Sequence, residues 1–239
     1  LRLCVIAGAS CPEDVFRHAS EVLHIDHFMV MYGMTEAGPG ISSTELQDPL
    51  RMVSTTVGRF WPMVEWKIRD LATGITLGEN QVGEICIKGP CVTEGYIRNI
   101  EETEKAFEDG WLRTGDIATV DRDGIIRLKG RCKDIIIRGG ENISPKEIED
   151  FLRQHPKIED ACVVGAPNRE FGESVYAFLI LKPGQELRLE ELRSDCKGKI
   201  STIKIPEEIE ILQQFPLTGS GKIAKEELKK IAAEHTRFS

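Results

Sequence analysis

The pattern of apolar residues changes near residues 131–134, and this change divides the chain into two folding units. Before it, an apolar strand, a helix and a second strand are followed by short strands separated by glycine-rich turns. After it come short β-branched strands, a well-marked helix, longer apolar strands and further helices. We therefore predict an α/β chain with an α/β first unit, residues 1–132, and a smaller α+β unit, residues 133–239, large enough for its own core.

The elements expected in the first unit are a buried strand over residues 1–6, a helix over 12–23 and a strand over 28–32. Short strands follow at 64–68, 83–88 and 125–128. In the second unit we predict strands at 135–137, 161–164, 174–181 and 208–212, and helices at 189–200 and from 224 onward. The best-marked helix has Ser144 as N-cap and Pro145 in its first position, and Glu147 completes a capping box.

Composition excludes several classes of function. Lys and Arg total 31 against 39 Asp and Glu, and this net charge of −8 argues against non-specific binding to nucleic acid or anionic membranes. No apolar run approaches the ~18 residues of a transmembrane segment. The seven cysteines contain no Cys-x-x-Cys pair, so neither a disulfide framework nor a zinc ribbon is expected. We expect reduced thiols in a cytoplasmic protein, or in a mitochondrial matrix protein if a targeting segment lies upstream.

The first polar motif follows the predicted strand at 28–32. Tyr32 could stack on a base, and Gly33 allows a ligand to approach the backbone. The Thr35 hydroxyl suits a phosphate, while the Glu36 carboxylate is a hard oxygen ligand for Mg²⁺. An ordinary strand-to-loop turn is the alternative interpretation of this motif.

Three further motifs contain polar residues beside glycine. Asp116 follows Gly115, at what we predict to be a strand end, and its carboxylate could accept both ribose hydroxyls. Arg131 offers a rigid fork for hydroxyl or phosphate oxygens, ahead of a Gly139-Gly140 pair. The alternatives are an Asx turn and a hairpin with solvated charges.

The last motif is a glycine-rich loop that presents Lys222 before a helix. Such a lysine could deliver a cation to a phosphate or carboxylate. The spacing is not that of a P-loop, and the loop alone is a weak signal.

Together and in this order, these motifs resemble the C-terminal part of the adenylate-forming acyl-CoA synthetase family. The resemblance extends over essentially the whole chain and includes residues 7–10, 32–36, 83–89, 95–99, 114–116, 130–131 and 220–222. It implies that residues 1–132 form the C-terminal portion of the large AMP-binding domain, a strand and helix layer with a small β-barrel-like subdomain. Residues 133–239 would be the small mobile domain.

The resemblance also implies an ATP-dependent carboxylate–CoA ligase acting on a fatty acid through an acyl-adenylate. Its ligands would be a small carboxylic acid, ATP, Mg²⁺ and coenzyme A, without nucleic acid or a transmembrane segment. The oligomeric state stays open, a homo-oligomer included.

Each motif position carries an implied role. The residues that would contact the adenine and its surroundings are Gly8, Ala9, Ser10, Tyr32 and Gly33. Phosphate, Mg²⁺ and ribose contacts fall to Thr35, Glu36, Asp116 and Arg131. Lys133 would be the hinge, Gly139 and Gly140 would line the pantetheine entry, and Lys222 would act in the adenylation conformation only.

The chain begins with Leu1 inside an apolar run, and no segment matches the Ser/Thr/Gly-rich phosphate loop that the family carries upstream. We therefore expect a fragment that is inactive on its own. Two alternatives stay open. One is an adenylation domain that loads an aryl or amino acid onto a carrier protein, and the other is a non-catalytic remnant that binds nucleotide or CoA.

Overall fold

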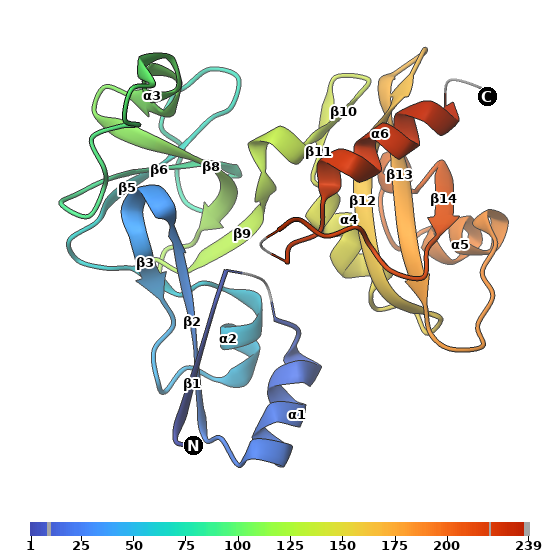
Figure 1. The fold of residues 1–239 in the computed structure, drawn as a ribbon, viewed down its shortest axis with the longest axis horizontal. Helices are drawn as coiled ribbons and strands as arrows, with labels where there is room; N and C mark the ends of the chain where they lie inside the picture. Colours follow the sequence, from blue (N-terminus) through green and yellow to red (C-terminus); the bar gives the residue numbers. More distant parts are fainter. Residues whose placement is uncertain (9–10, 220, 237–239) are drawn as a thin grey trace. The chain divides into compact units, whose positions relative to one another are not determined.

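The computed structural model describes residues 1–8, 11–219 and 221–236. These form two compact units, Leu1–Lys129 and Gly130–Ser239 (Figure 1). The predicted boundary after Cys132 falls in the short helix η2 (Cys132–Asp134), just past this division. As functional domains, the ranges 1–132 and 133–239 stay a prediction. No helix among the described residues is both long and apolar enough to cross a membrane.

The first sheet has the order β1-β2-β3-β4 and places the Tyr32 motif at its centre. Strand β1 (Leu3–Ala7) runs parallel to β2 (His27–Met34), with helix α1 (Glu13–Leu23) as the crossover. The short helix η1 (Thr35–Ala37) turns the chain into β3 (Gly38–Ser43), and α2 (Leu50–Thr55) precedes β4 (Arg59–Phe60). The predicted strands and the helix at 12–23 are confirmed.

The prediction that the first strand is buried is wrong. Leu3 and Val5 are 41% and 47% exposed, because they alternate with Cys4 and Ile6 and so lie on the face of β1 away from α1. The α1 side of the strand carries Cys4 and Ile6, which pack with Phe16.

A second, antiparallel sheet completes the first unit. Its order is β5-β6-β8-β7, and β9 also pairs with β8. The strands are β5 (Glu65–Arg69), β6 (Gly83–Lys88), β7 (Phe107–Glu108), β8 (Trp111–Val120) and β9 (Ile126–Arg131), and α3 (Ile100–Ala106) leads into β7. Apolar side chains of β5, β6 and β8 share one core with Tyr32 and Ile41 of the first sheet. This common core holds the two sheets together.

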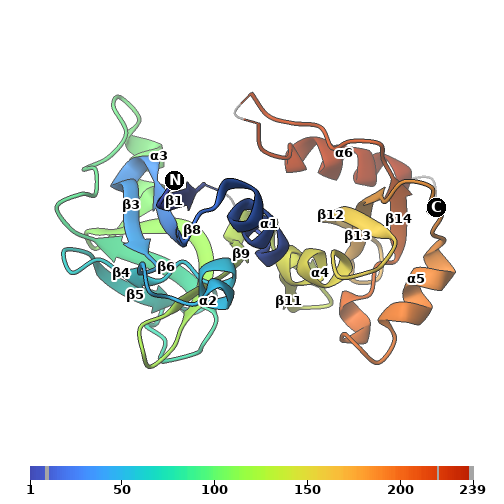
Figure 2. The same cartoon turned by 90° about the horizontal axis from the view of Figure 1, so that it is seen from below.

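The second unit is a mixed sheet covered on both faces (Figure 2). Its order is β11-β10-β13-β12, with β14 parallel to β13. The strands are β10 (Ile136–Arg138), β11 (Glu141–Ile143), β12 (Ile158–Asn168), β13 (Gly172–Leu181) and β14 (Glu208–Ile211). Helices α4 (Pro145–Leu152) and α5 (Leu189–Cys196) pack on one face, and α6 (Lys225–Thr236) packs on the other.

Two local predictions in this unit are wrong. Pro145 does begin α4, but the Ser144 side chain makes no capping hydrogen bond. Glu147 pairs with Lys204 at 2.6 Å instead of closing a capping box, because the chain before β14 brings a stronger partner within reach. Helix α5 ends at Cys196 instead of continuing to Ile200, since Gly198 turns the chain with a φ of 78°.

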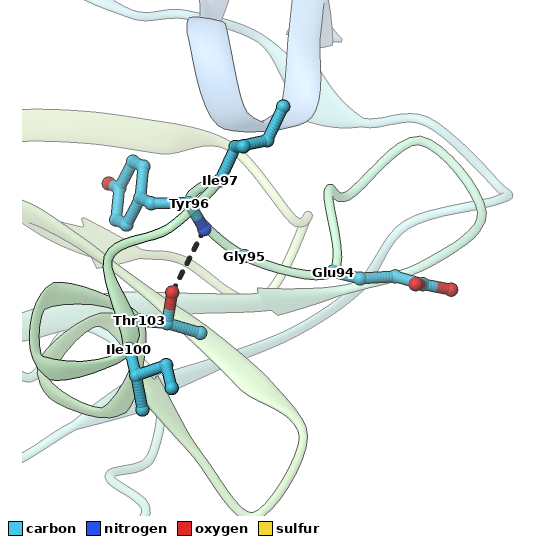
Figure 3. A pocket seen from close by; sticks show the side chains of 6 residues that line it. All are labelled: Glu94, Gly95, Tyr96, Ile97, Ile100 and Thr103. Carbon is cyan, nitrogen blue, oxygen red and sulfur yellow. Dashed lines mark hydrogen bonds between the residues drawn. The ribbon is translucent and has the colours of Figure 1, made fainter.

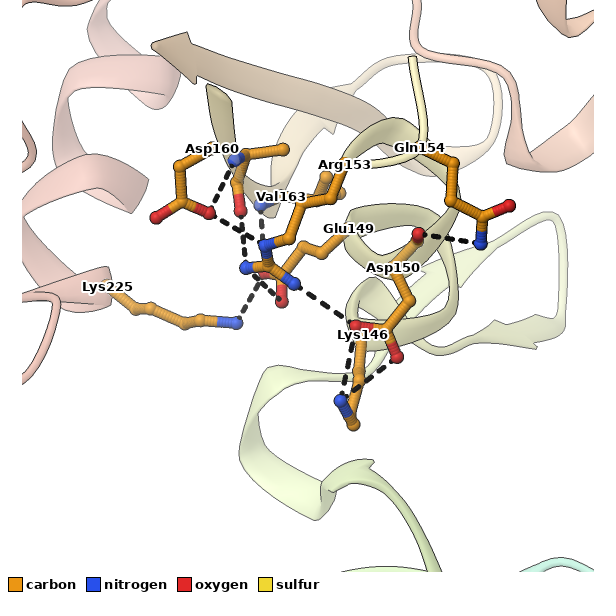
Figure 4. Close-up of polar contacts among 9 residues, drawn as sticks. Lys146, Glu149, Asp150, Arg153, Gln154, Asp160, Val163 and Lys225 are labelled. Atoms are coloured by element: carbon orange, nitrogen blue, oxygen red, sulfur yellow. Dashed lines mark hydrogen bonds and ion pairs between the residues drawn. The ribbon is translucent and has the colours of Figure 1, made fainter. Parts of the chain in front are cut away.

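Helix α4 also carries a buried carboxylate (Figure 4). The side chain of Glu149 is 9% exposed and accepts hydrogen bonds from Lys225 Nζ at 2.8 Å and from the Val163 backbone N–H at 3.0 Å. Arg153 lies 3.9 Å away and binds Asp160 at 2.7 Å. Burial, the largest single effect, lowers the pKa of Lys225, but the charge and hydrogen bond of Glu149, together with Cys162 and Asp134, raise the pKa on balance. The network ties α4 and the start of α6 to β12.

Candidate functional site

A side-chain hydrogen bond joins strand β2 to strand β8. The Tyr32 hydroxyl donates to Asp116 Oδ2 at 2.7 Å across 84 positions of sequence. Tyr32 is 8% exposed, and its side chain belongs to the core shared by the two sheets. The structure therefore brings together two of the motifs that the sequence singled out.

Asp116 lies inside β8, so its predicted place at a strand end is wrong. Arg113 pairs with Cys86 and Ile117 pairs with Glu84, which leaves residues 114–116 opposite Ile85 alone. Gly115 has a φ of 71°, a left-handed conformation that glycine adopts without strain. The result is a β-bulge, the kind of irregularity that redirects a side chain out of a regular strand.

A buried carboxylate holds this bulge. Glu84, with a side chain only 3% exposed, accepts hydrogen bonds from the Gly115 N–H at 3.2 Å and from Arg113 Nε at 3.0 Å. Arg69 lies 3.8 Å from the same carboxylate. The Thr114 hydroxyl adds a bond of 2.9 Å to the Ile85 carbonyl. Sequence reasoning gave Glu84 no role, although a charged residue inside an apolar strand was the available signal.

Glu36 stands in η1, directly after β2, and has a partner that the sequence did not reveal. The Tyr96 hydroxyl donates to Glu36 Oε1 at 2.7 Å. This hydrogen bond raises the pKa of Tyr96, and partial burial adds to the shift. Tyr96 belongs to a hollow of about 350 Å³ lined by Glu94, Gly95, Tyr96, Ile97, Ile100 and Thr103 (Figure 3). Thr35, beside Glu36, is exposed.

Gly33 and Gly8, both predicted to lie near the nucleotide, require glycine for different structural reasons. A Cβ on Gly33 would lie 2.5 Å from the Pro39 carbonyl oxygen, so the turn from β2 to β3 excludes any side chain there. Gly8 follows β1 with a φ of 82°. Ala9 and Ser10 lie outside the described residues, and the contacts expected of them stay predictions.

The second unit carries the remaining candidate residues. Arg131 ends β9 and is exposed. Lys133 lies in η2, where its ammonium is 3.6 Å from Glu226 and its carbonyl accepts a hydrogen bond of 3.0 Å from Lys229. Gly139 and Gly140 form the turn between β10 and β11 with φ of 57° and 86°. Positive φ at both positions explains the glycine pair.

Lys222 lies on an exposed loop that folds back on itself. The Thr218 N–H donates to the Lys222 carbonyl at 2.7 Å, and the Lys222 N–H donates to Thr218 Oγ1 at 3.2 Å. Leu217 and Ile223 pair as an isolated antiparallel bridge below these bonds. These bonds join Thr218 to Lys222, while the Lys222 residue stays exposed to solvent.

These features define the chemical groups that the first unit offers to a ligand. The first unit has an aromatic ring and a carboxylate joined by a hydrogen bond, with a hydroxyl and a second carboxylate at the end of β2. Glu36 fits a Mg²⁺ ion that is held mainly by phosphate, since Mg²⁺ takes one or two carboxylates together with phosphate oxygens and water. Among the described residues, no group of three or more His, Cys, Asp or Glu could hold a metal without such a ligand.

Comparison with known proteins gives matches in both units. Residues 1–97 match the family described as AMP-binding enzyme, and residues 147–222 match the AMP-binding enzyme C-terminal domain. YngI of Bacillus subtilis (strain 168), provisionally named an acyl-CoA synthetase, is 43% identical over 100% of this chain and 44% of its own length. The medium-chain acyl-CoA ligase ACSF2, mitochondrial, of Rattus norvegicus is 41% identical over 98% of this chain and 38% of its own length. The chain thus spans less than half the length of these relatives.

Solved structures show the same fold. ATP-bound MatB from Rhodopseudomonas palustris has a TM-score of 0.87 at 30% identity, over 96% of this chain and 45% of that protein. The amide bond synthetase McbA from Marinactinospora thermotolerans has a TM-score of 0.85 at 33% identity, over 96% of this chain and 47% of that protein.

Proposed function

Because this chain belongs to the AMP-binding enzyme family, with acyl-CoA synthetases among its relatives, we propose that it provides the C-terminal part of an ATP-dependent carboxylate–CoA ligase. In this reaction the carboxylate attacks the α-phosphorus of ATP, pyrophosphate leaves, and the CoA thiol then displaces AMP from the acyl-adenylate. The observation that carries the proposal is the 2.7 Å hydrogen bond that joins the Tyr32 motif to Asp116 within the matched fold.

We assign the nucleotide contacts of the first unit as follows. Asp116, held by the β8 bulge, accepts hydrogen bonds from the ribose hydroxyls. The chain around Tyr32 borders the adenine. Thr35 donates to a phosphate oxygen. Glu36 holds Mg²⁺, which supplies neutralisation of phosphate charge when it is bound.

The second unit supplies the groups that differ between the two half-reactions. Lys222 brings a positive charge to the carboxylate and the α-phosphate during adenylation. Lys133 is the proposed hinge, and Arg131 adds to the ribose contacts. The turn at Gly139 and Gly140 borders the pantetheine arm in the second step.

A fatty acid of medium length is the proposed substrate, on the strength of the likeness to ACSF2, whose name gives that class. A second candidate function has an acceptor other than CoA, such as an amine or a carrier protein. The likeness to McbA, an amide bond synthetase, supports it.

The test is carboxylate-dependent exchange of labelled pyrophosphate into ATP by the natural protein in its full length. We expect exchange with medium-chain fatty acids, and formation of AMP and acyl-CoA once CoA is added. An absence of exchange with every acid would refute the ligase. Exchange without use of CoA would favour the second candidate function. The 239-residue chain alone is the companion sample: we expect it to show no exchange, because no segment of it matches the family's phosphate loop.

Asp116→Asn tests the ribose contact. We expect the wild-type protein to bind AMP at least about ten times more tightly than 2′,3′-dideoxy-AMP, since a hydrogen bond to a charged group contributes ~1.5–3 kcal/mol. The variant should lose most of this preference, as measured by calorimetric titration of both nucleotides. Asp123→Asn, at the exposed turn after β8, is the control and should keep it. A preference that survives Asp116→Asn would remove Asp116 from the ribose site.

A further inference from the structure

The geometry points to Tyr96 as a positioning residue for the metal. We propose that its hydroxyl fixes Glu36 through Oε1, so that Oε2 is held ready for the Mg²⁺ of MgATP. This inference rests on the proposed function, in which Glu36 is the metal ligand.

Glu36 is held at two points by the segment that contains Tyr96. Its Oε1 accepts the Tyr96 hydroxyl at 2.7 Å, and its backbone carbonyl accepts the Thr93 N–H at 2.7 Å. Within the described part of the chain, Oε2 has no hydrogen-bond partner. Ordering a flexible glutamate side chain costs conformational entropy, and a pre-formed hydrogen bond moves that cost from metal binding to folding.

Tyr96 is itself fixed by the first turn of α3. Its N–H donates to Thr103 Oγ1 at 2.9 Å, and its carbonyl accepts the Asn99 N–H at 3.2 Å (Figure 3). Thr103 Oγ1 donates in turn to the Asn99 carbonyl at 2.8 Å. Asn99 also caps the helix by accepting the Glu102 N–H at 3.2 Å. The position of the Tyr96 backbone is therefore determined by a capped helix.

Gly95 permits this close approach of loop and helix. Its φ is 149°, a conformation that few other residues adopt, and a Cβ there would lie 2.6 Å from Thr103 Cγ2. The two residues of the Gly95-Tyr96 pair therefore have different roles. The glycine lets the chain reach α3, and the tyrosine reaches Glu36.

The chemistry of Mg²⁺ makes the orientation of this carboxylate important. Where phosphate oxygens and water supply most of the coordination, the protein contributes only one or two carboxylates. If Glu36 is the single protein ligand, no second carboxylate can bind the metal in its place when the Glu36 side chain points away. Partners that hydrogen-bond to ligating groups typically account for 10–100-fold in metal affinity.

The experiment compares Tyr96→Phe with the wild-type protein in its natural full length. The probe is Mn²⁺, titrated by electron paramagnetic resonance into the complex with ATP, and ATP binding without metal is measured separately in EDTA. We expect the Mn²⁺ dissociation constant to rise about tenfold, with metal-free ATP affinity unchanged. Since Tyr96 is partly exposed and Phe keeps the ring, the variant should fold.

Two further variants complete the design. Ile100→Ala alters the same hollow without touching Glu36 and should leave Mn²⁺ affinity as in the wild type. Glu36→Gln should weaken Mn²⁺ binding at least as much as Tyr96→Phe. Wild-type Mn²⁺ affinity in Tyr96→Phe together with a weakened Glu36→Gln would overturn the positioning role alone. Wild-type affinity in both variants would overturn the metal role of Glu36 and the inference with it.

Discussion

Replacing Lys222 with Ala is expected to slow acyl-adenylate formation by about 10²–10³-fold. Removing one group that stabilises developing charge on an oxygen typically costs this much. Lys222 suits that role because its loop is closed by the two Thr218 hydrogen bonds while the residue stays exposed. Thioester formation from a supplied acyl-adenylate should change little, because in the proposed function Lys222 contacts the reacting groups during adenylation only.

The measurement is single-turnover kinetics of both steps in the natural protein. Lys230→Ala, an exposed lysine of α6, removes the same charge and should leave both rates unchanged. If Lys222→Ala slowed the two half-reactions equally, the lysine would not be specific to adenylation, and a change of domain position between the steps would lose its main support.

Replacing Glu149 with Ala should destabilise the second unit by about 3–5 kcal/mol, the usual result of breaking a buried ion pair by removing one partner. The substitution leaves the buried part of Lys225 and the Val163 N–H without their acceptor (Figure 4). Arg153 keeps Asp160, so the loss centres on the contact between α4, α6 and β12.

Urea unfolding followed by far-ultraviolet circular dichroism measures this loss, and hydrogen exchange of the Val163 region assigns it to the second unit. All three tryptophans lie in the first unit, so tryptophan fluorescence follows that unit separately. Glu147→Ala in the same helix breaks only an exposed pair with Lys204 and should cost at most about 1 kcal/mol. Equal losses of unfolding free energy in the two variants would show that the buried Glu149 ion pair stabilises the unit no more than the exposed Glu147 pair does.

Local signals in the sequence predicted much of the fold. Alternating apolar residues predicted β6, and Pro145 predicted the start of α4. The capping box at Ser144 failed because Lys204, 57 positions away from Glu147, competes for that carboxylate. A local motif cannot report a partner that arrives through tertiary packing.

The candidate site shows the same division. The residue types of the Tyr32 motif and of Asp116 predicted nucleotide chemistry from the sequence alone. The bulge that holds Asp116 depends on Glu84, and the orientation of Glu36 depends on Tyr96, 60 positions away. These contacts join separate elements, so only the folded chain reveals which polar residues support the site.

The contacts of Lys229 bear on where the second unit can pivot. Lys229 of α6 donates to the Lys133 carbonyl at 3.0 Å and lies 3.9 Å from Asp134, so the segment that enters the unit is fastened to its last described helix. If Lys133 acts as the proposed hinge, this contact makes Asp134 and α6 turn together as one body. The pivot then falls on the chain that precedes them.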